Sequence, residues 1–149
     1  MFPLMKKHLY LGQDVDGYAV VSFNSNYTGG SMKTPLIVNG ENYADTLTLI
    51  SSFNSGGSVN IYGGGTATTS FTDWRLPSKT ELENIKNLFD NTPGSIIPIG
   101  QTIWTSTNGV LDPSTNKYAM ESTAGGYLFF EYNKVASIFD MMLIRNFTL

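Results

Sequence analysis

The chain has 149 residues, the length of a single domain, and its 9 basic and 12 acidic side chains give a net charge of −3. This balance excludes the basic footprint that binding to nucleic acid or to anionic lipid requires. The chain has no cysteine, which excludes disulfides, thiolate zinc sites and thiol nucleophiles, and its only histidine is His8, which disfavours a Ser-His triad or a His-rich metal site.

The remaining composition favours a folded, β-rich domain with a neutral polar surface. Hydrophobic residues make up 41% of the chain, aromatic residues 13% and charged residues only 14%. A chain of this composition has enough apolar surface to fold. Because most catalytic templates are missing, we expect a protein that is not an enzyme and that has no cofactor and no metal site.

The first ten residues are predicted to form an N-terminal arm, followed by a single domain over residues 11–149. The arm carries its lysines after a short apolar stretch, and no long apolar segment follows, so it does not have the pattern of a secretory signal. No run of about 18 apolar residues is present, and we therefore expect no membrane insertion.

Residues 9–11 and 18–23 predict a β-hairpin, because both stretches are mostly apolar or aromatic and a polar Gly-containing turn separates them. The turn contains Asp14 and Asp16 in an Asp-x-Asp-Gly sequence. It lacks the further oxygen ligands and the closing glutamate of a calcium loop, so an ordinary turn is favoured over a calcium site.

The next elements are a short strand over residues 34–38 and a helix over residues 42–52. The helix is predicted because apolar residues recur at helical spacing. These residues are Tyr43, Leu47 and Ile50. Residues 54–70 are rich in Gly, Ser and Thr and lack the Gly-Lys-Ser/Thr ending of a phosphate loop, so a flexible surface loop is predicted there.

The clearest local signal is a helix start at Ser78. Ser78 and Glu81 form an S-x-x-E capping box, in which each side chain satisfies an orphan amide of the first turn. Apolar residues then follow on one face from Leu82 to Phe89, and the sequence Asp-Asn-Thr-Pro-Gly over residues 90–94 ends the helix. We therefore predict a short amphipathic helix that packs on a sheet.

The C-terminal half predicts an antiparallel meander of four strands separated by strong turn sequences. The predicted strands cover residues 102–107, 117–121, 127–132 and 141–147.

The sequence Asp73-Trp74-Arg75-Leu76-Pro77-Ser78-Lys79-Thr80-Glu81-Leu82, followed by Trp104-Thr105-Ser106-Thr107, Tyr118-Ala119 and Leu143-Ile144-Arg145-Asn146-Phe147, resembles a known family. This family is the C-terminal domain of bacterial collagen-like adhesins, which has a C-type-lectin-like fold. The order and spacing agree from about Leu11 to Phe147. The resemblance implies an α+β fold in which two helices flank a small twisted antiparallel sheet with a C-terminal β-meander, the chain ends meet in one edge hairpin, and a long loop region carries binding.

The motif residues are expected to have structural roles. They are Trp74, Arg75, Leu76, Pro77, Ser78, Glu81, Trp104 and Arg145. We expect the two tryptophans to fill the core beneath the second helix rather than to contact a ligand. Each arginine is expected to pair with a local carboxylate or to cap carbonyls rather than to bind an acidic ligand. Glu121 and Glu131 are interpreted as outward, solvated side chains rather than as a catalytic pair.

A glycan site would combine aromatic rings for stacking with amide and hydroxyl groups for hydrogen bonding. The candidates in or beside predicted loops are Tyr27, Tyr62, Asn108, Asp112 and Tyr127. The same chemistry suits a protein-binding surface equally well.

Domains of the family that this chain resembles occur in bacterial surface proteins and in phage and prophage proteins, where they bind glycans or host-surface molecules. We therefore expect a non-enzymatic component of a phage virion, such as a tail-tip, fibre or capsid-decoration protein. Its partners would be other virion proteins or a host-surface glycan or protein, and a homo-oligomer fits this interpretation. The alternatives are a bacterial surface or secreted adhesin module that binds polysaccharide, and a purely structural virion protein.

Overall fold

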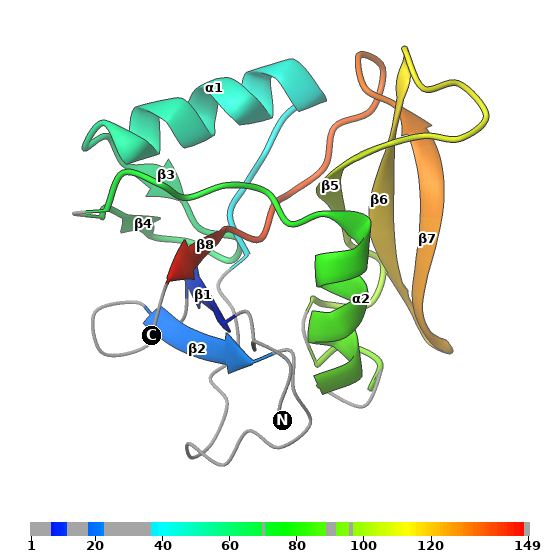
Figure 1. Cartoon of the computed structure of the whole chain (residues 1–149), viewed down its shortest axis with the longest axis horizontal. Helices are drawn as coiled ribbons and strands as arrows, with labels where there is room; N and C mark the ends of the chain where they lie inside the picture. The colour runs from blue at the N-terminus through cyan, green and yellow to red at the C-terminus, as the bar shows by residue number, and fades with distance from the viewer. Residues whose placement is uncertain are drawn as a thin grey trace, which may run out of the picture.

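The computed structural model describes residues 7–11, 18–22, 37–69, 71–88, 92–95 and 97–147. This part of the chain forms an α+β fold with two helices and three antiparallel sheets (Figure 1). The α+β class predicted from the sequence is therefore confirmed. Neither helix is long and apolar enough to cross a membrane.

The first sheet brings the two ends of the described chain together. Its central strand β1 (Lys7–Leu11) pairs with β2 (Tyr18–Ser22) on one side and with β8 (Ile144–Phe147) on the other, both antiparallel. The predicted N-terminal hairpin is confirmed. Residues 7–10, which the arm prediction includes, instead lie inside this sheet, because their backbone groups pair with neighbours on both sides. Residues 1–6 of the predicted arm lie outside the described residues.

The second large sheet is the predicted meander. Strands β5 (Thr102–Asn108), β6 (Asn116–Thr123) and β7 (Gly126–Asn133) pair in that order. The fourth predicted strand, over residues 141–147, is shorter than expected and belongs to the other sheet. It is regular only from Ile144, and Met141 makes an isolated bridge with Val38. Residues 34–36 of the predicted strand 34–38 lie outside the described residues, and Val38 forms isolated bridges rather than part of a regular strand.

A small hairpin lies where the sequence predicts a flexible loop. Strands β3 (Val59–Asn60) and β4 (Thr66–Ala67) pair antiparallel, and Ile61 bridges to Val38. The turn between them uses three consecutive glycines with positive φ, Gly63 to Gly65, a conformation that other residues rarely adopt. The prediction of a loop over 54–70 is thus wrong for these strands.

The two helices begin at the caps that the sequence supplies. Helix α1 (Tyr43–Asn54) starts after Asn42, whose Oδ1 accepts a hydrogen bond from the Asp45 amide at 2.9 Å. Helix α2 (Lys79–Leu88) starts after Ser78. The capping box is confirmed, because the Ser78 amide donates to Glu81 Oε1 at 2.9 Å and the Glu81 amide donates to Ser78 Oγ at 3.1 Å.

The core is divided between the two faces of the β5–β6–β7 sheet. Neighbouring residues on a strand point to opposite faces; in β5, Ile103 pairs with Met120 on one face and Trp104 with Ala119 on the other. The Met120 face packs with Leu82 and Ile85 of α2. The Ala119 face shares a cluster with Ile50 and Phe53 of α1, and this cluster contains both Trp74 and Trp104.

The tryptophans are therefore core residues, 2% and 0% exposed, but their helix is not the predicted one. They pack in the cluster of α1, whereas the prediction placed them beneath α2. The reason is register, because β5 and the segment before α2 point their indoles away from the face that α2 covers. Figure 1 shows α2 beside the β5–β6–β7 sheet and α1 over the β3–β4 side of the molecule.

Candidate functional site

An open groove of about 660 Å³ lies between α1 and the segment that leads into α2. We call it the α1 groove. One wall is a face of the helix that includes Tyr43, Leu47 and Ser51, and the other includes Thr72 and Arg75; Ser106 of β5 also lines the groove.

One side chain at the C-terminal end of α1 joins the two walls of the α1 groove by hydrogen bonds. The Nδ2 atom of Asn54 donates to the carbonyl oxygen of Trp74 at 2.9 Å, and its Oδ1 accepts from the amide of Trp74 at 3.0 Å. The side chain of Asn54 thus satisfies the backbone amide and carbonyl of Trp74, as a neighbouring β-strand would. This clasp fixes the spacing between the helix and the opposite wall.

The α1 groove combines apolar surface with unused hydroxyl groups. Leu47 is 44% exposed. The side-chain hydroxyls of Tyr43, Ser51, Thr72 and Ser106 make no hydrogen bond within the part of the chain that the structure describes. A phenol with the ordinary pKa of 10.0 is protonated at neutral pH and can donate, and burial raises the pKa of Tyr43 further. Groups of this kind are the ones that recognise sugars.

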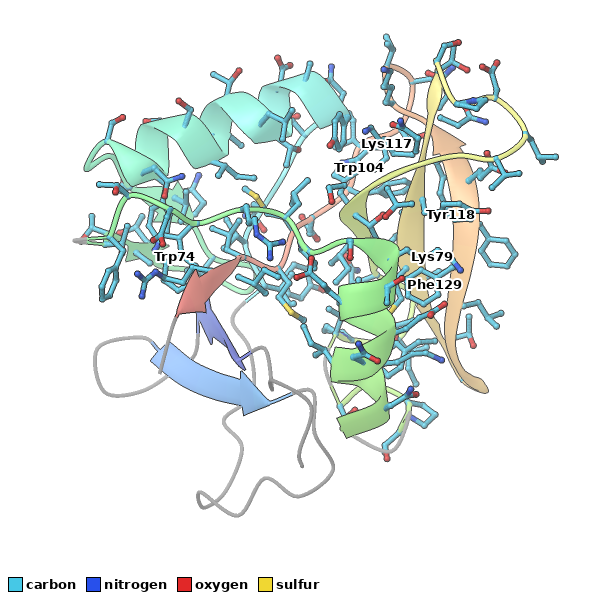
Figure 2. The ribbon with its side chains drawn as sticks, in the orientation of Figure 1. Trp74, Lys79, Trp104, Lys117, Tyr118 and Phe129 are labelled. Carbon is cyan, nitrogen blue, oxygen red and sulfur yellow. The ribbon has the colours of Figure 1, made fainter. Side chains whose placement is uncertain are left out.

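The ring of Tyr43 is fixed at one end of the α1 groove. It packs edge-on against Trp104 with the ring centroids 5.5 Å apart. The ammonium group of Lys117 lies 4.8 Å from the centroid of the Tyr43 ring and donates to the carbonyl oxygen of Ser106 at 3.2 Å. Figure 2 shows Lys117 beside the start of α1, with Trp104 below it. Desolvation by burial, and then the positive charge of Lys134, lower the pKa of Lys117.

Both motif arginines pair with a local carboxylate, as predicted. Arg75 holds Glu81 with two bonds of 2.7 Å, from Nη1 to Oε1 and from Nη2 to Oε2, and its Nη1 also donates to the carbonyl of Leu76 at 3.1 Å. Arg145 donates from Nε to Asp73 Oδ1 at 2.6 Å. Glu81 therefore caps α2 and neutralises the cation on the wall of the α1 groove.

The remaining motif residues are part of the framework. Leu76 is 3% exposed, and Pro77 is buried while its carbonyl accepts from the amide of Ser106 at 2.9 Å. This bond joins the segment before α2 to β5, next to the α1 groove. The motif thus positions the wall of the groove more than it supplies groups to a ligand.

The structure does not bring the five predicted ligand residues together. Tyr62 is 40% exposed beside β3, whereas Asn108 ends β5 and Asp112 lies in the following turn. Hydrogen bonds from Thr115 and Ser114 lower the pKa of Asp112. Tyr127 is 3% exposed in the core cluster of α2, with its hydroxyl 3.1 Å from Ser95 Oγ, and is not open to a ligand. Tyr27 lies outside the described residues, and none of the other four lines the α1 groove.

Glu121 and Glu131 do not face each other. Glu121 pairs with Leu128 and Glu131 pairs with Tyr118, so the two carboxylates lie on opposite faces of the sheet. Each has another partner: Glu121 accepts from the Tyr132 hydroxyl at 3.3 Å, and Glu131 accepts from the amide of Leu111 at 3.0 Å. This arrangement does not form the facing pair that glycoside hydrolysis needs.

The sequence analysis missed the α1 groove because its walls come from separate segments. One signal was available. The stripe that predicted the helix, Tyr43, Leu47 and Ile50, also includes Ser51 and Asn54 when it is extended at the same spacing. Such a mixed apolar and polar stripe is typical of a helix face that is covered only in part.

No family model, no curated protein and no solved structure matches this chain. In the described part of the chain, no three His, Asp or Glu side chains come together as a metal site would need.

Proposed function

We propose that this chain is a non-catalytic, saccharide-binding domain with a C-type-lectin-like fold, and that it attaches a phage particle to a glycan on the surface of its host. The observation that carries the proposal is the α1 groove, which offers an aromatic ring, apolar surface and four hydroxyls that make no hydrogen bond within the described residues. A saccharide presents complementary groups, since one face of its ring is apolar and its edge is rich in hydroxyls.

Three features support the proposed fold. The first and last strands of the described chain are paired, two helices flank antiparallel sheets, and a three-stranded meander follows α2. The segment from Asp73 to Leu82, which carries the resemblance to the adhesin family, builds a wall of the α1 groove through Arg75 and Leu76.

A panel of neutral and acidic bacterial polysaccharides immobilised on a surface tests the binding function. We expect saturable binding by the wild-type chain and loss of binding when Ser51→Trp fills the α1 groove. Tyr43→Ala removes the stacking ring and should also reduce binding. Tyr62→Ala is the matched control, because it removes an exposed tyrosine that lies outside the groove. Folded groove variants that bind as well as the wild type would contradict the proposal.

The location is tested separately by mass spectrometry of purified phage particles. Presence of the chain in intact particles supports the virion role. If the chain is found instead on the bacterial surface, an adhesin that uses the same groove replaces the phage component. If it is present in particles but a folded chain binds no saccharide, a purely structural virion role replaces attachment.

A further inference from the structure

We infer that the α1 groove selects acidic saccharides and that Lys117 is the residue that binds their carboxylate. This inference rests on the proposed function, and it names the class of ligand that the same site takes. It is carried by the charges around the groove and by the position of one ammonium group.

None of the described residues that line the α1 groove is acidic, although the chain contains 12 Asp and Glu residues. The cation on its wall, Arg75, is held by Glu81 with two bonds of 2.7 Å. A neutral or acidic ligand therefore meets no carboxylate among the described lining residues, and the charge of Arg75 is already compensated by Glu81.

Lys117, in contrast to Arg75, is a cation with which no described carboxylate pairs. The described ion pairs are Arg75 with Glu81, Lys79 with Glu83 and Arg145 with Asp73, so Lys117 has no carboxylate partner in the described part of the chain. Its one hydrogen bond goes to the carbonyl of Ser106, at 3.2 Å. An ammonium group has three N–H donors, so two are left for a ligand.

Lys117 lies next to the α1 groove without lining it. Its Nζ touches two groove residues, Ser106 through the hydrogen bond and Tyr43 through the ring face at 4.8 Å. The contact with the ring holds the long side chain in place, which lowers the entropy cost of binding an anion. A sugar that stacks near Tyr43 would place a ring carboxylate within reach of this ammonium group.

Lys134 adds to the attraction. Its charge is close enough to Lys117 to lower the pKa of Lys117 by repulsion. An anion between or beside these lysines would relieve that repulsion, whereas a neutral sugar would not. The amide of Tyr43 donates to the carbonyl of Lys134 at 2.9 Å, so Lys117 and Lys134 both lie near this end of the groove.

The test compares each acidic polysaccharide with its own neutral derivative. Oligogalacturonate and oligosialic acid are titrated against the full chain, together with their carboxyl methyl esters, at low and high salt. We expect the wild type to bind the acid about 10-fold more tightly than the ester, the effect of one hydrogen bond to a charged group. The preference should decrease at high salt.

Three variants assign the effect. Lys117→Gln should remove the preference for the acid and leave ester binding unchanged, and Lys117→Arg should keep it. Lys86→Gln on α2 is the matched control, because it removes the same charge from a residue for which the described part of the chain shows no contact with Tyr43 or Ser106, the two groove residues that Lys117 contacts. Thermal unfolding of each variant checks that the fold is intact.

The outcomes separate the two proposals. Equal binding of acid and ester, binding of neutral saccharides only, or an acid preference that survives in Lys117→Gln would overturn the role of Lys117 and leave the proposed function standing. Failure of a folded wild-type chain to bind any neutral or acidic saccharide would overturn the proposed function, and this inference with it.

Discussion

Replacement of Asn54 by alanine should destabilise the protein well beyond the usual effect of a substitution at a helix end. The side chain of Asn54 makes two hydrogen bonds, both part-buried, to the backbone amide and carbonyl of Trp74. Alanine favours the helix but can make neither bond. The variant therefore loses both hydrogen bonds between this side chain and the backbone of Trp74.

The size of the effect follows from these two bonds. Each intramolecular hydrogen bond contributes about 1 kcal/mol net, and an orphaned buried group costs about 1–3 kcal/mol. Because water reaches part of this site, we expect a total loss of about 2–4 kcal/mol in the free energy of unfolding. For a domain of this length, 1 kcal/mol corresponds to about 2–4 °C, so the thermal midpoint should decrease by roughly 5–15 °C.

Urea unfolding followed by tryptophan fluorescence measures this loss, since both indoles are buried in the cluster that the clasp helps to close. Asn87→Ala, on the exposed side of α2, is the matched control and should change the free energy of unfolding by less than about 0.5 kcal/mol. If Asn54→Ala and Asn87→Ala have the same stability, the clasp does not hold the walls of the α1 groove together and the argument is refuted.

Three further substitutions test other parts of the framework. Glu81→Ala should cost about 1–3 kcal/mol, mostly from the bond to the Ser78 amide, because Arg75 is 38% exposed and solvent screens its ion pair; a loss below 0.5 kcal/mol in urea unfolding would contradict this. Burial raises the pKa of Asp140 above its ordinary value of 3.8, so the stability that its protonation provides is present below pH 4 and is lost as the pH increases through the raised pKa. Asp140→Asn should therefore gain stability relative to the wild type between pH 4 and pH 7, and parallel stability curves would disprove the assignment. Gly40→Ala places a Cβ against a backbone carbonyl of the segment before β8 and should cost about 1–3 kcal/mol; an unchanged thermal midpoint by circular dichroism would show that the contact relaxes freely.

The parts of the fold that depend on near neighbours could be predicted from the sequence. The start of α2 was predictable because Ser78 and Glu81 satisfy each other across three residues, and the meander was predictable because turn sequences separate its strands. The N-terminal hairpin follows the same logic. In each case, the residues that decide the structure lie within one turn of helix or one strand pair.

The parts that were missed depend on partners far away in the sequence. Strands β3 and β4 have two residues each, too short for a pattern, and the hairpin is tied to Val38 through Ile61. Trp104 packs against α1 because its indole lies on the face of β5 that α1 covers. Periodicity alone does not show which helix covers which face of the sheet. The α1 groove joins residues 43, 72 and 106, and no local rule relates these positions.

The pairing of β1 with β8 determines how the domain responds to force. Because the strands are antiparallel and Lys7 lies opposite Phe147, the outer ends of both strands are at the same end of the pair. Tension that pulls these two ends apart breaks the hydrogen bonds between β1 and β8 one after another, in the unzipping geometry, and does not load all of them at once. If the domain were held by one end of the chain and by a ligand in the α1 groove, force would pass between that end and the groove. This force would not have to separate β1 from β8. A tethered domain of this topology is therefore mechanically weak between its two ends, and single-molecule pulling through Lys7 and Phe147 should open the sheet at low force.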